Sequence, residues 1–260
     1  NLDCENCISA AQNNIVKNIT FSASGNTNAD FYANNVCNSC GFASFDVYKN
    51  NQFYISVKLS APGEHNVSNA LAAIAVCDLC GISKEDVVKG LFSYVGVGRR
   101  FEYKGSFCGA EVYDDYAHHP QEISCTLKAA KGLDFKRVWA VFQPFTYTRT
   151  EILMEDFVEA LSIADIPVIT DIMGSREKNT HGIYAEQLAC KIPNAVWFDT
   201  PHQVVDLQTA EQKEKNFNQI IDYIIENATE GDLVITLGCG DVYKLAKSLA
   251  KKLRQSEDKG

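Results

Sequence analysis

The chain has no long apolar run and no stretch in which lysines and arginines cluster. A helix that crosses a membrane needs roughly 18 or more consecutive apolar residues, and no segment approaches that length. Binding to nucleic acid by phosphate neutralisation needs clustered basic side chains, whereas the net charge here is -9. No charged-then-apolar signal pattern occurs at the amino end either. We therefore expect a cytoplasmic protein with no membrane insertion and no nucleic-acid partner.

The composition is otherwise that of an ordinary globular protein. Apolar residues make up 46% and charged residues 22% of 260 residues, which leaves enough chain for two domains. There is no internal repeat and no low-complexity segment. The chain opens at Asn1, so we expect it to be a piece of a longer protein. The sequence leaves the oligomeric state open, a homodimer included.

Ten cysteines could suggest a zinc site. Six of them form the C-x-x-C pairs Cys4/Cys7, Cys37/Cys40 and Cys77/Cys80. The 29 residues between the first two pairs exceed the usual spacing of about 15 to 20, and the third pair lies in a helical pattern. Structural disulfides are disfavoured in a cytosolic protein of this size. The sequence therefore predicts no metal site.

The first part of the chain reads as a partial sheet followed by two helices. Short β-rich pieces are predicted at 19–22, 42–48 and 52–59, with Asn and Gly turns between them. An apolar helix follows over 69–80, and Ser83 is placed to cap a second helix over 84–92. Gly96 and Gly98 then break the pattern. We place a domain boundary there and expect domains at 1–97 and 98–260.

The second part alternates strands and helices, the pattern of an α/β fold. The predicted strands are 101–107, 109–113, 138–142, 168–171, 195–198 and 233–237. The predicted helices are 123–130, 151–164, 185–190, 217–227 and 242–253, with a frayed tail at 254–260. This order indicates a Rossmann-like, mostly parallel sheet. The first two strands are too close for a helical crossover, so we expect one antiparallel edge strand.

The most informative segment is 114–120, which reads D-D-Y-A-H-H-P. It packs two carboxylates, a phenol and two imidazoles into seven residues at the end of a predicted strand. Ligands of open α/β sheets gather at the carboxyl ends of the strands, so this is a candidate site. The alternative is a turn in which Asp114 or Asp115 caps the next helix and Pro120 begins it.

Polar or glycine-rich residues also follow three other predicted strands. These segments are 142–150 with Arg149, 171–177 with Asp171, Ser175 and Arg176, and 238–241, which reads G-C-G-D. Arg149 is suited to a carboxylate, because its guanidinium offers a planar fork of donors. Adjacent Arg99 and Arg100 at the domain junction suit a phosphate, or else lie solvated at the surface.

His65, Asn66 and Asn69 lie at the entry of the apolar helix. The two asparagines are three residues apart and so share one helix face. Their carboxamides could bind an adenine edge, since each has a donor and an acceptor. Capping of the helix by Asn66 explains the same spacing equally well.

Five segments in this order resemble the Mur ligase family. They are 63–70 (G-E-H-N-V-S-N-A), 98–102 (G-R-R-F-E), 114–120, 142–150 (F-Q-P-F-T-Y-T-R-T) and 238–241. The resemblance spans the chain and implies the later part of a central ATPase domain over 1–97 and a carboxyl-terminal Rossmann-like domain over 98–260. The family's phosphate loop, G-x-x-x-x-G-K-[ST], does not occur in this sequence.

The resemblance implies an ATP-dependent ligase of peptidoglycan synthesis that joins L-alanine to UDP-N-acetylmuramate through an acyl phosphate. It implies ATP and Mg²⁺ as cofactors, both bound mainly by parts that this chain lacks, so the chain alone should be inactive. By motif, His65, Asn66 and Asn69 belong to the ATP site, Arg100 lies near the transferring phosphate, and Asp115 lies at the ribose. His118 and Arg149 would contact the alanine, and Arg100, Asp115 and His118 would form the catalytic group. Relatives often carry histidine where this chain has Phe145, and alanine where it has Cys239.

Two alternatives remain. The first is a ligase that joins a tripeptide to the same muramate nucleotide, since such enzymes share the pattern D-D-x-A-H-H-P. The second is a nucleotide-binding or protein-interaction module without catalysis, which the absent phosphate loop would permit.

Overall fold

The computed structural model describes residues 1–12, 16, 18–39, 41–198, 201–202 and 209–252. The chain divides into two compact units, Asn1–Gly96 and Val97–Gly260. The division falls one residue before the boundary that the glycines Gly96 and Gly98 predict. Each unit is described by itself.

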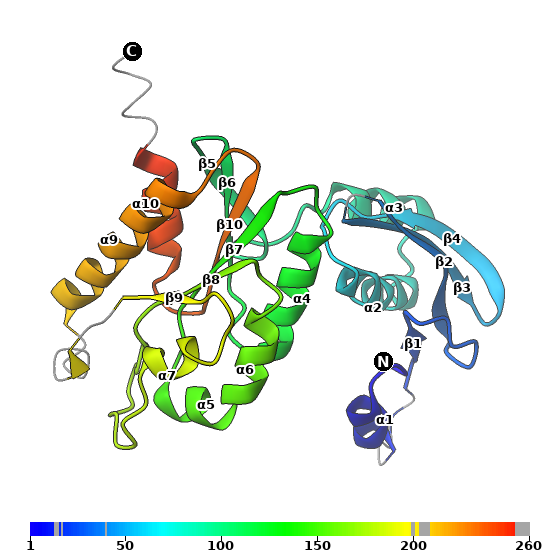
Figure 1. The fold of residues 1–260 in the computed structure, drawn as a ribbon. Coiled ribbons are helices and arrows are strands. Elements are labelled where there is room, and N and C mark those ends of the chain that lie inside the picture. Colours follow the sequence, from blue (N-terminus) through cyan, green and yellow to red (C-terminus); the bar gives the residue numbers. More distant parts are fainter. Residues whose placement is uncertain (13–15, 17, 40, 199–200, 203–208, 253–260) are drawn as a thin grey trace. The chain divides into compact units, whose positions relative to one another are not determined.

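The first unit contains a four-stranded sheet in the order β1-β2-β3-β4 (Figure 1). Its strands are β1 (Phe21–Ser22), β2 (Phe31–Ser39), β3 (Phe42–Lys49) and β4 (Gln52–Lys58). β1 pairs parallel with β2, and the remaining neighbours pair antiparallel. Asn50 and Asn51 join β3 to β4 with φ values of 49° and 64°, the left-handed conformation that a two-residue hairpin turn requires and asparagine tolerates.

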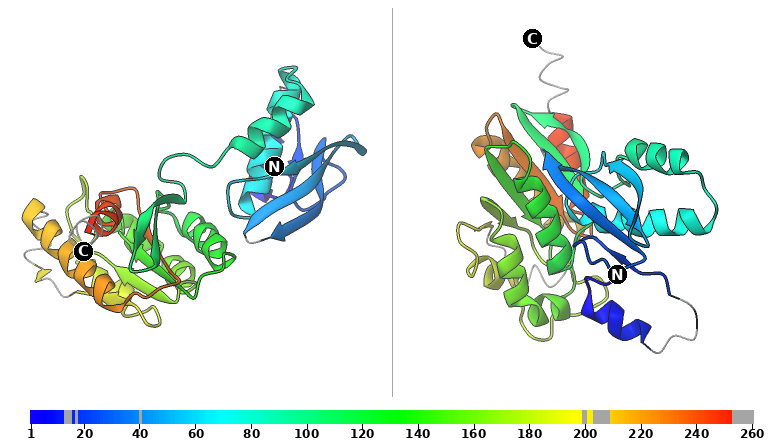
Figure 2. Two further views of the ribbon diagram at one scale, coloured as in Figure 1. Left: turned by 90° about the horizontal axis from the view of Figure 1, so that it is seen from above. Right: turned by 90° about the vertical axis from the view of Figure 1, so that its right-hand side faces the viewer.

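Two helices cover one face of this sheet (Figure 2), namely α2 (His65–Leu79) and α3 (Lys84–Ser93). Leu71 and Ile74 of α2 are fully buried against Val47 and its neighbours. Ser83 caps α3, as predicted, by accepting from Asp86 N at 3.1 Å.

The sequence misses two elements of the first unit and misplaces one helix start. Helix α1 (Glu5–Ala11) has no buried residue and so no apolar pattern. β2 is irregular, with a bulge between Asn34 and Cys37 and an exposed second half, which hides its alternation. α2 begins at His65 rather than Asn69, because its first turn is polar.

The second unit is built on a six-stranded sheet in the order β5-β6-β10-β7-β8-β9. Its strands are β5 (Glu102–Phe107), β6 (Ala110–Asp115), β7 (Arg137–Phe142), β8 (Ile166–Ile169), β9 (Val196–Trp197) and β10 (Asp232–Leu237). β5 pairs antiparallel with β6, and every other neighbouring pair is parallel. This confirms the mostly parallel Rossmann-like sheet with one antiparallel edge strand.

Helices cover both faces of this sheet (Figure 1). α4 (Pro120–Lys131), α6 (Met154–Leu161) and α7 (Ala185–Ala189) lie on one face, and α9 (Ala210–Asn227) and α10 (Tyr243–Lys252) lie on the other. Alternate β7 residues enter opposite cores, with Phe142 on the α4 side and Trp139 on the α9 side. Because both faces are buried, the central strands are continuously apolar.

Two predicted helices of the second unit differ from the structure. The run 151–164 forms α5 (Tyr147–Ile152) and α6, separated at Leu153, where φ is -104° and ψ is 22°. The run 217–227 is the later part of α9, which begins seven residues earlier after Thr209, the residue that caps it. Its first two turns carry mainly charged and polar side chains, so they give no apolar signal. The predicted tail, 254–260, lies outside the described residues, as does residue 253.

Candidate functional site

Four polar loops meet at one edge of the second sheet. They follow β6, β10, β7 and β8, which are consecutive neighbours and all parallel. Their carboxyl ends therefore open on the same side, the place where open α/β sheets bind ligands. The segments that the sequence predicts to line one edge do so, because the strand order makes them neighbours.

Asp114, within β6, is fully buried and paired with an arginine. Its Oδ2 accepts from Arg99 Nε at 2.9 Å, and its Oδ1 accepts from Thr236 Oγ1 at 2.7 Å. Arg99 also donates to the carbonyl oxygens of Gly238 and Gly240, at 2.6 and 3.4 Å. The pair therefore joins the segment before β5 to the glycine turn after β10, and Asp114 does not cap α4.

Asp115 ends β6 and is 4% exposed. Its Oδ2 accepts from Phe101 N at 2.9 Å and its Oδ1 from Ala117 N at 2.8 Å. Burial raises the pKa of Asp115, although these two N–H bonds and the charge of Arg100 oppose the rise. Arg100 Nη1 lies 3.9 Å from Asp115 Oδ1, so this ion pair is loose.

The cap of α4 is His119, not an aspartate. The imidazole of His119 and the carboxylate of Glu122 form a reciprocal capping box, and Pro120 is the first helical residue. His119 therefore has a structural task. Pro120 does begin the helix, but the alternative in which Asp114 or Asp115 caps it is wrong, because both aspartates are still in the strand.

His118 and Arg100 converge on Glu122, which the sequence had not marked. His118 Nδ1 lies 3.0 Å from Tyr116 O and 3.4 Å from Glu122 Oε2. Because a carbonyl oxygen can only accept, Nδ1 carries a proton in this geometry. Arg100 Nη2 lies 3.9 Å from Glu122 Oε1, and the Arg100 side chain is 46% exposed. Burial alone would raise the pKa of Glu122, but N–H bonds from His118 and His119 and the nearby charges lower it.

Arg149 holds a buried donor atom that lacks a partner. Among the described residues, its Nη1 is buried and makes no hydrogen bond. The guanidinium carbon lies 5.9 Å from the centroid of the Phe145 ring. Burial raises the pKa of the Cys239 thiol, and the positive charge of Arg149 opposes that rise, as expected if Arg149 faces the glycine turn after β10. A buried guanidinium nitrogen without an acceptor suits an anionic ligand.

Gln143 binds the two residues that follow the glycine turn after β10. Its Nε2 donates to Asp241 Oδ1 at 2.9 Å, and its Oε1 accepts from Val242 N at 3.1 Å. A Cβ at Gly240 would collide with Gln143 Oε1 and with Met173 Sδ. Any larger residue at this position would therefore have to displace the ends of the Gln143 and Met173 side chains.

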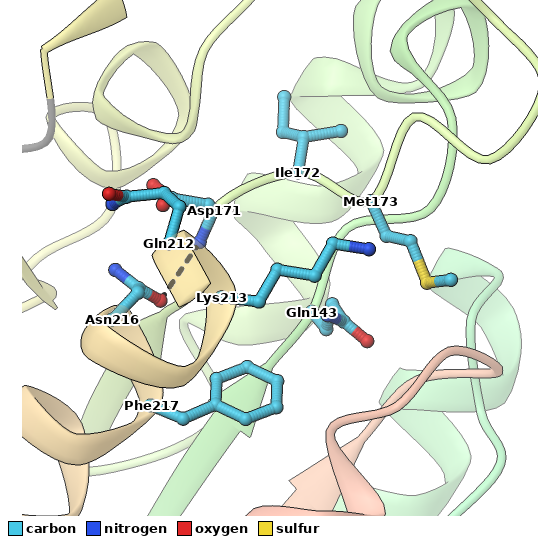
Figure 3. A pocket seen from close by; sticks show the side chains of 8 residues that line it. All are labelled: Gln143, Asp171, Ile172, Met173, Gln212, Lys213, Asn216 and Phe217. Atoms are coloured by element: carbon cyan, nitrogen blue, oxygen red, sulfur yellow. Dashed lines mark hydrogen bonds between the residues drawn. The ribbon is translucent and has the colours of Figure 1, made fainter. Parts of the chain in front are cut away.

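Asp171, after β8, lines a small pocket against α9. Figure 3 shows it facing Asn216, whose Oδ1 accepts from Asp171 N at 3.4 Å. Gln143, Lys213 and Phe217 lie around the same pocket. Ser175 and Arg176 are exposed on the following loop. The four loops thus share an edge, and the residues that line the Asp171 pocket do not include His118 or Arg149.

The first unit holds a larger pocket between α2, α3 and the end of β4. It has a volume of about 360 Å³ and is lined by apolar side chains, by Tyr94 and by Asn66 and Asn69. Asn69 Nδ2 donates to Asn66 Oδ1 at 2.9 Å, and Asn66 Nδ2 donates to Pro62 O at 2.7 Å. Asn66 is the second residue of α2, whose N-cap is Glu64, so Asn66 does not cap it. His65 is exposed at the helix start and outside the pocket lining.

The residues that the structure describes contain no group of three or more His, Cys, Asp or Glu side chains arranged for a metal ion. Cys77 lies within α2 and Cys80 ends it, as the helical pattern predicts. Cys40 lies outside the described residues, which leaves the Cys37/Cys40 pair untested. No helix in the described ranges combines the length and apolarity needed to span a membrane.

Two family profiles match the chain. The "Mur ligase, glutamate ligase domain" matches residues 99–240, which is more than half of the chain, and the "Mur ligase middle domain" matches residues 1–77. The UDP-N-acetylmuramate–L-alanine ligase of Acetivibrio thermocellus is 45% identical over 214 residues, 82% of this chain and 43% of that protein.

Solved structures agree on the fold. A UDP-N-acetylmuramate–alanine ligase from Thermotoga maritima superposes with a TM-score of 0.72 at 24% identity, covering 92% of this chain and 48% of that one. A murein peptide ligase from Psychrobacter arcticus gives a TM-score of 0.58 at 25% identity, covering 88% and 45%. The chain spans about half the length of the curated relatives it matches. On the strength of the two family matches, the chain belongs to the Mur ligase family.

Proposed function

We propose that this chain is the later part of an ATP-dependent ligase that joins L-alanine to UDP-N-acetylmuramate in peptidoglycan synthesis. One observation carries the proposal, which is the buried Nη1 of Arg149 without a partner among the described residues at the ligand-binding edge of the sheet. An amino acid brings the carboxylate that this nitrogen lacks. The relatives at up to 45% identity are named for this reaction.

The reaction divides into activation and attack. ATP would transfer its terminal phosphoryl group to the muramyl carboxylate, giving an acyl phosphate and ADP. The alanine amine would then attack the acyl carbon, and the tetrahedral intermediate would release phosphate to leave an amide. Such chemistry depends on positioning and on neutralising charge more than on a nucleophilic side chain.

In the second unit, Arg149 would hold the alanine carboxylate through its unpartnered nitrogen. His118 carries its Nδ1 proton toward Tyr116 O, so a neutral ring presents Nε2 as an acceptor for the incoming ammonium group. Glu122, 3.4 Å from His118 Nδ1, would stabilise the imidazole ring when its Nε2 takes a proton from the ammonium group. We therefore assign the amino-acid site to His118 and Arg149.

Arg100 and Asp115 would serve the nucleotide. Arg100 is half exposed and its two carboxylate partners are 3.9 Å away, so a phosphate could compete for its guanidinium. Asp115 accepts two backbone N–H bonds and a side-chain bond from Thr126, which leaves at least one lone pair of the carboxylate for a ribose hydroxyl.

The pocket of the first unit would take the adenine. Its apolar walls suit a planar base, and the Asn69 carboxamide keeps an acceptor oxygen and a second amide hydrogen beyond its bond to Asn66. That pairing matches the donor and acceptor of an adenine edge. His65, at the start of the same helix, stays in the proposed ATP site by motif only.

The described residues contain no group of three or more His, Cys, Asp or Glu side chains that could hold a metal ion, and we assign no Mg²⁺ ligand to this chain. ATP and a UDP-sugar are cytoplasmic compounds, and we place the enzyme in the cytoplasm accordingly.

The test is a steady-state assay of the complete ligase that carries this sequence. Arg149→Ala should raise the KM for L-alanine roughly 30-fold or more, the effect of leaving a buried charge pair incomplete, and should leave the KM for ATP near its original value. Arg149→Lys keeps the charge but loses the planar fork, so its KM for L-alanine should lie between those of the original enzyme and Arg149→Ala. Equal changes in both KM values would refute the assignment.

A further inference from the structure

The loop after β8 is bonded directly to the segment that carries Arg149. Met173 N donates to Pro144 O and Thr146 N donates to Met173 O, both at 2.9 Å. Phe145 and Met173 thereby form a short parallel bridge beyond the ends of β7 and β8. The backbone just before α5 is therefore set by this loop.

The loop after β8 also contacts Tyr147, the first helical residue of α5. A Cβ at Gly174 would lie 2.5 Å from Tyr147 Cε2, closer than real atoms approach, so the loop backbone rests on the tyrosine ring. Tyr147 is 4% exposed. This contact leaves the loop and α5 little freedom to move separately.

Glu177, three residues after Gly174 on the same loop, caps α5, whose own N-cap residue makes no side-chain cap bond. The N-cap residue Thr146 makes no side-chain cap bond and has φ 66° and ψ 143°, an uncommon conformation for a β-branched residue. Instead, Glu177 Oε2 accepts from Thr148 N at 2.9 Å. A carboxylate at this end also complements the helix dipole. Arg149 is the next residue along the chain.

We infer that Glu177 is a positioning residue for Arg149, and through it a determinant of amino-acid affinity. The inference rests on the proposed function. α5 has six residues, too few to be stable alone, so its first turn depends on the Glu177 cap as well as on the packing of Tyr147. Loss of the cap would let Arg149 sample orientations in which its unpartnered Nη1 no longer faces the ligand.

The experiment compares variants of the complete ligase by KM and kcat. Glu177→Ala is expected to raise the KM for L-alanine about fivefold, the usual weight of a helix cap, with kcat and the KM for ATP within about twofold of the original. Glu177→Gln keeps an acceptor oxygen and should restore most of the affinity. Gly174→Ala moves the same loop by steric contact and should give the same selective rise.

Glu155→Ala is the matched control, because Glu155 is exposed on α6 and pairs with Lys191 at 2.7 Å. It should leave all three constants unchanged. Combining Glu177→Ala with Arg149→Ala should give no further rise beyond Arg149→Ala alone, since one residue acts through the other.

An unchanged KM for L-alanine in Glu177→Ala overturns the inference, as does a full additional rise in the double variant. A parallel rise in the KM for ATP, or a loss that Glu177→Gln shares in full, also overturns it. These results are distinct from failure of the proposed function, in which Arg149→Ala itself leaves the KM for L-alanine unchanged.

Discussion

Arg99 and Arg100 are neighbours in sequence, yet the fold uses them differently. Arg99 has φ 58° and directs its guanidinium inward to Asp114 and to two carbonyl oxygens of the glycine turn. Its guanidinium also lies 4.9 and 4.8 Å from the rings of Tyr116 and Tyr243. Arg100 stays half exposed. The inner arginine is thus structural, and the outer one is available to a ligand.

Replacement of Arg99 by alanine should therefore destabilise the second unit. It leaves the Asp114 carboxylate, which is fully buried, with Thr236 as its remaining side-chain partner. We expect a loss of about 3 kcal/mol in the free energy of unfolding, measured by urea denaturation. Arg100→Ala is the matched control and should change it by less than about 0.5 kcal/mol. Equal losses in the two variants would contradict this division of tasks.

At the scale of elements, β10 and β7 are held together at their amino ends by an ion pair between the buried Asp232 and the partly exposed Arg137. Asp232, fully buried, accepts from Arg137 Nη2 and, at 3.1 Å, from Trp139 Nε1. Burial alone would raise the pKa of Asp232, but the bonds from Arg137, Thr229 and Trp139 outweigh it and lower the pKa. A lowered pKa means that the ionised carboxylate favours the folded state.

The resulting stability should depend on pH in one direction. The contribution of Asp232 is fully present above its unfolded pKa of 3.8, and is lost as the pH falls through the lower folded value. Asp232→Asn should cost about 2 kcal/mol at pH 7, and the difference from the original should shrink below pH ~4. Asp156→Asn, on the exposed side of α6, is the control. A difference that stays constant down to acid pH would be contrary to this account.

The sequence predicts well those elements whose buried face gives a regular spacing of apolar residues. α9 places Phe217, Ile220, Ile221 and Ile224 on one face, and the central strands are apolar throughout. The pattern fails where an element is half exposed or polar at its start, as in β2 and the first turns of α2 and α9. It also fails at Leu153, where a helix changes direction without a proline or glycine to mark the break.

The candidate site, too, is predicted only in part from the sequence. Residue types at strand ends predict Asp115, His118 and Arg149, and the strand order brings their loops together. The sequence does not predict Glu122 and Glu177, because their roles depend on the backbone N–H groups that they bind. Glu122 accepts from N–H groups at the start of its own helix, and Glu177 accepts from a helix residue 29 positions away. Chain order does not reveal such partners, although a glutamate three residues after a cap is a usable signal for the first.

At the scale of the whole molecule, the chain holds two units with separate cores, each with its own candidate site. The first offers a pocket suited to a base, and the second offers a sheet edge suited to an amino acid and phosphate. A ligase that couples ATP to amide formation needs both. The chain contains no phosphate-loop sequence, and it spans about half the length of the curated relatives it matches.

The most direct measurement gives the complete ligase ATP and UDP-N-acetylmuramate with either L-alanine or a muropeptide-type tripeptide, and identifies the product by mass spectrometry. Our account predicts that the nucleotide gains one alanine residue, with ADP and phosphate released in equal amounts, and that the tripeptide is a poor substrate. Joining of the tripeptide in preference to L-alanine, or release of phosphate without an amide product, would contradict it.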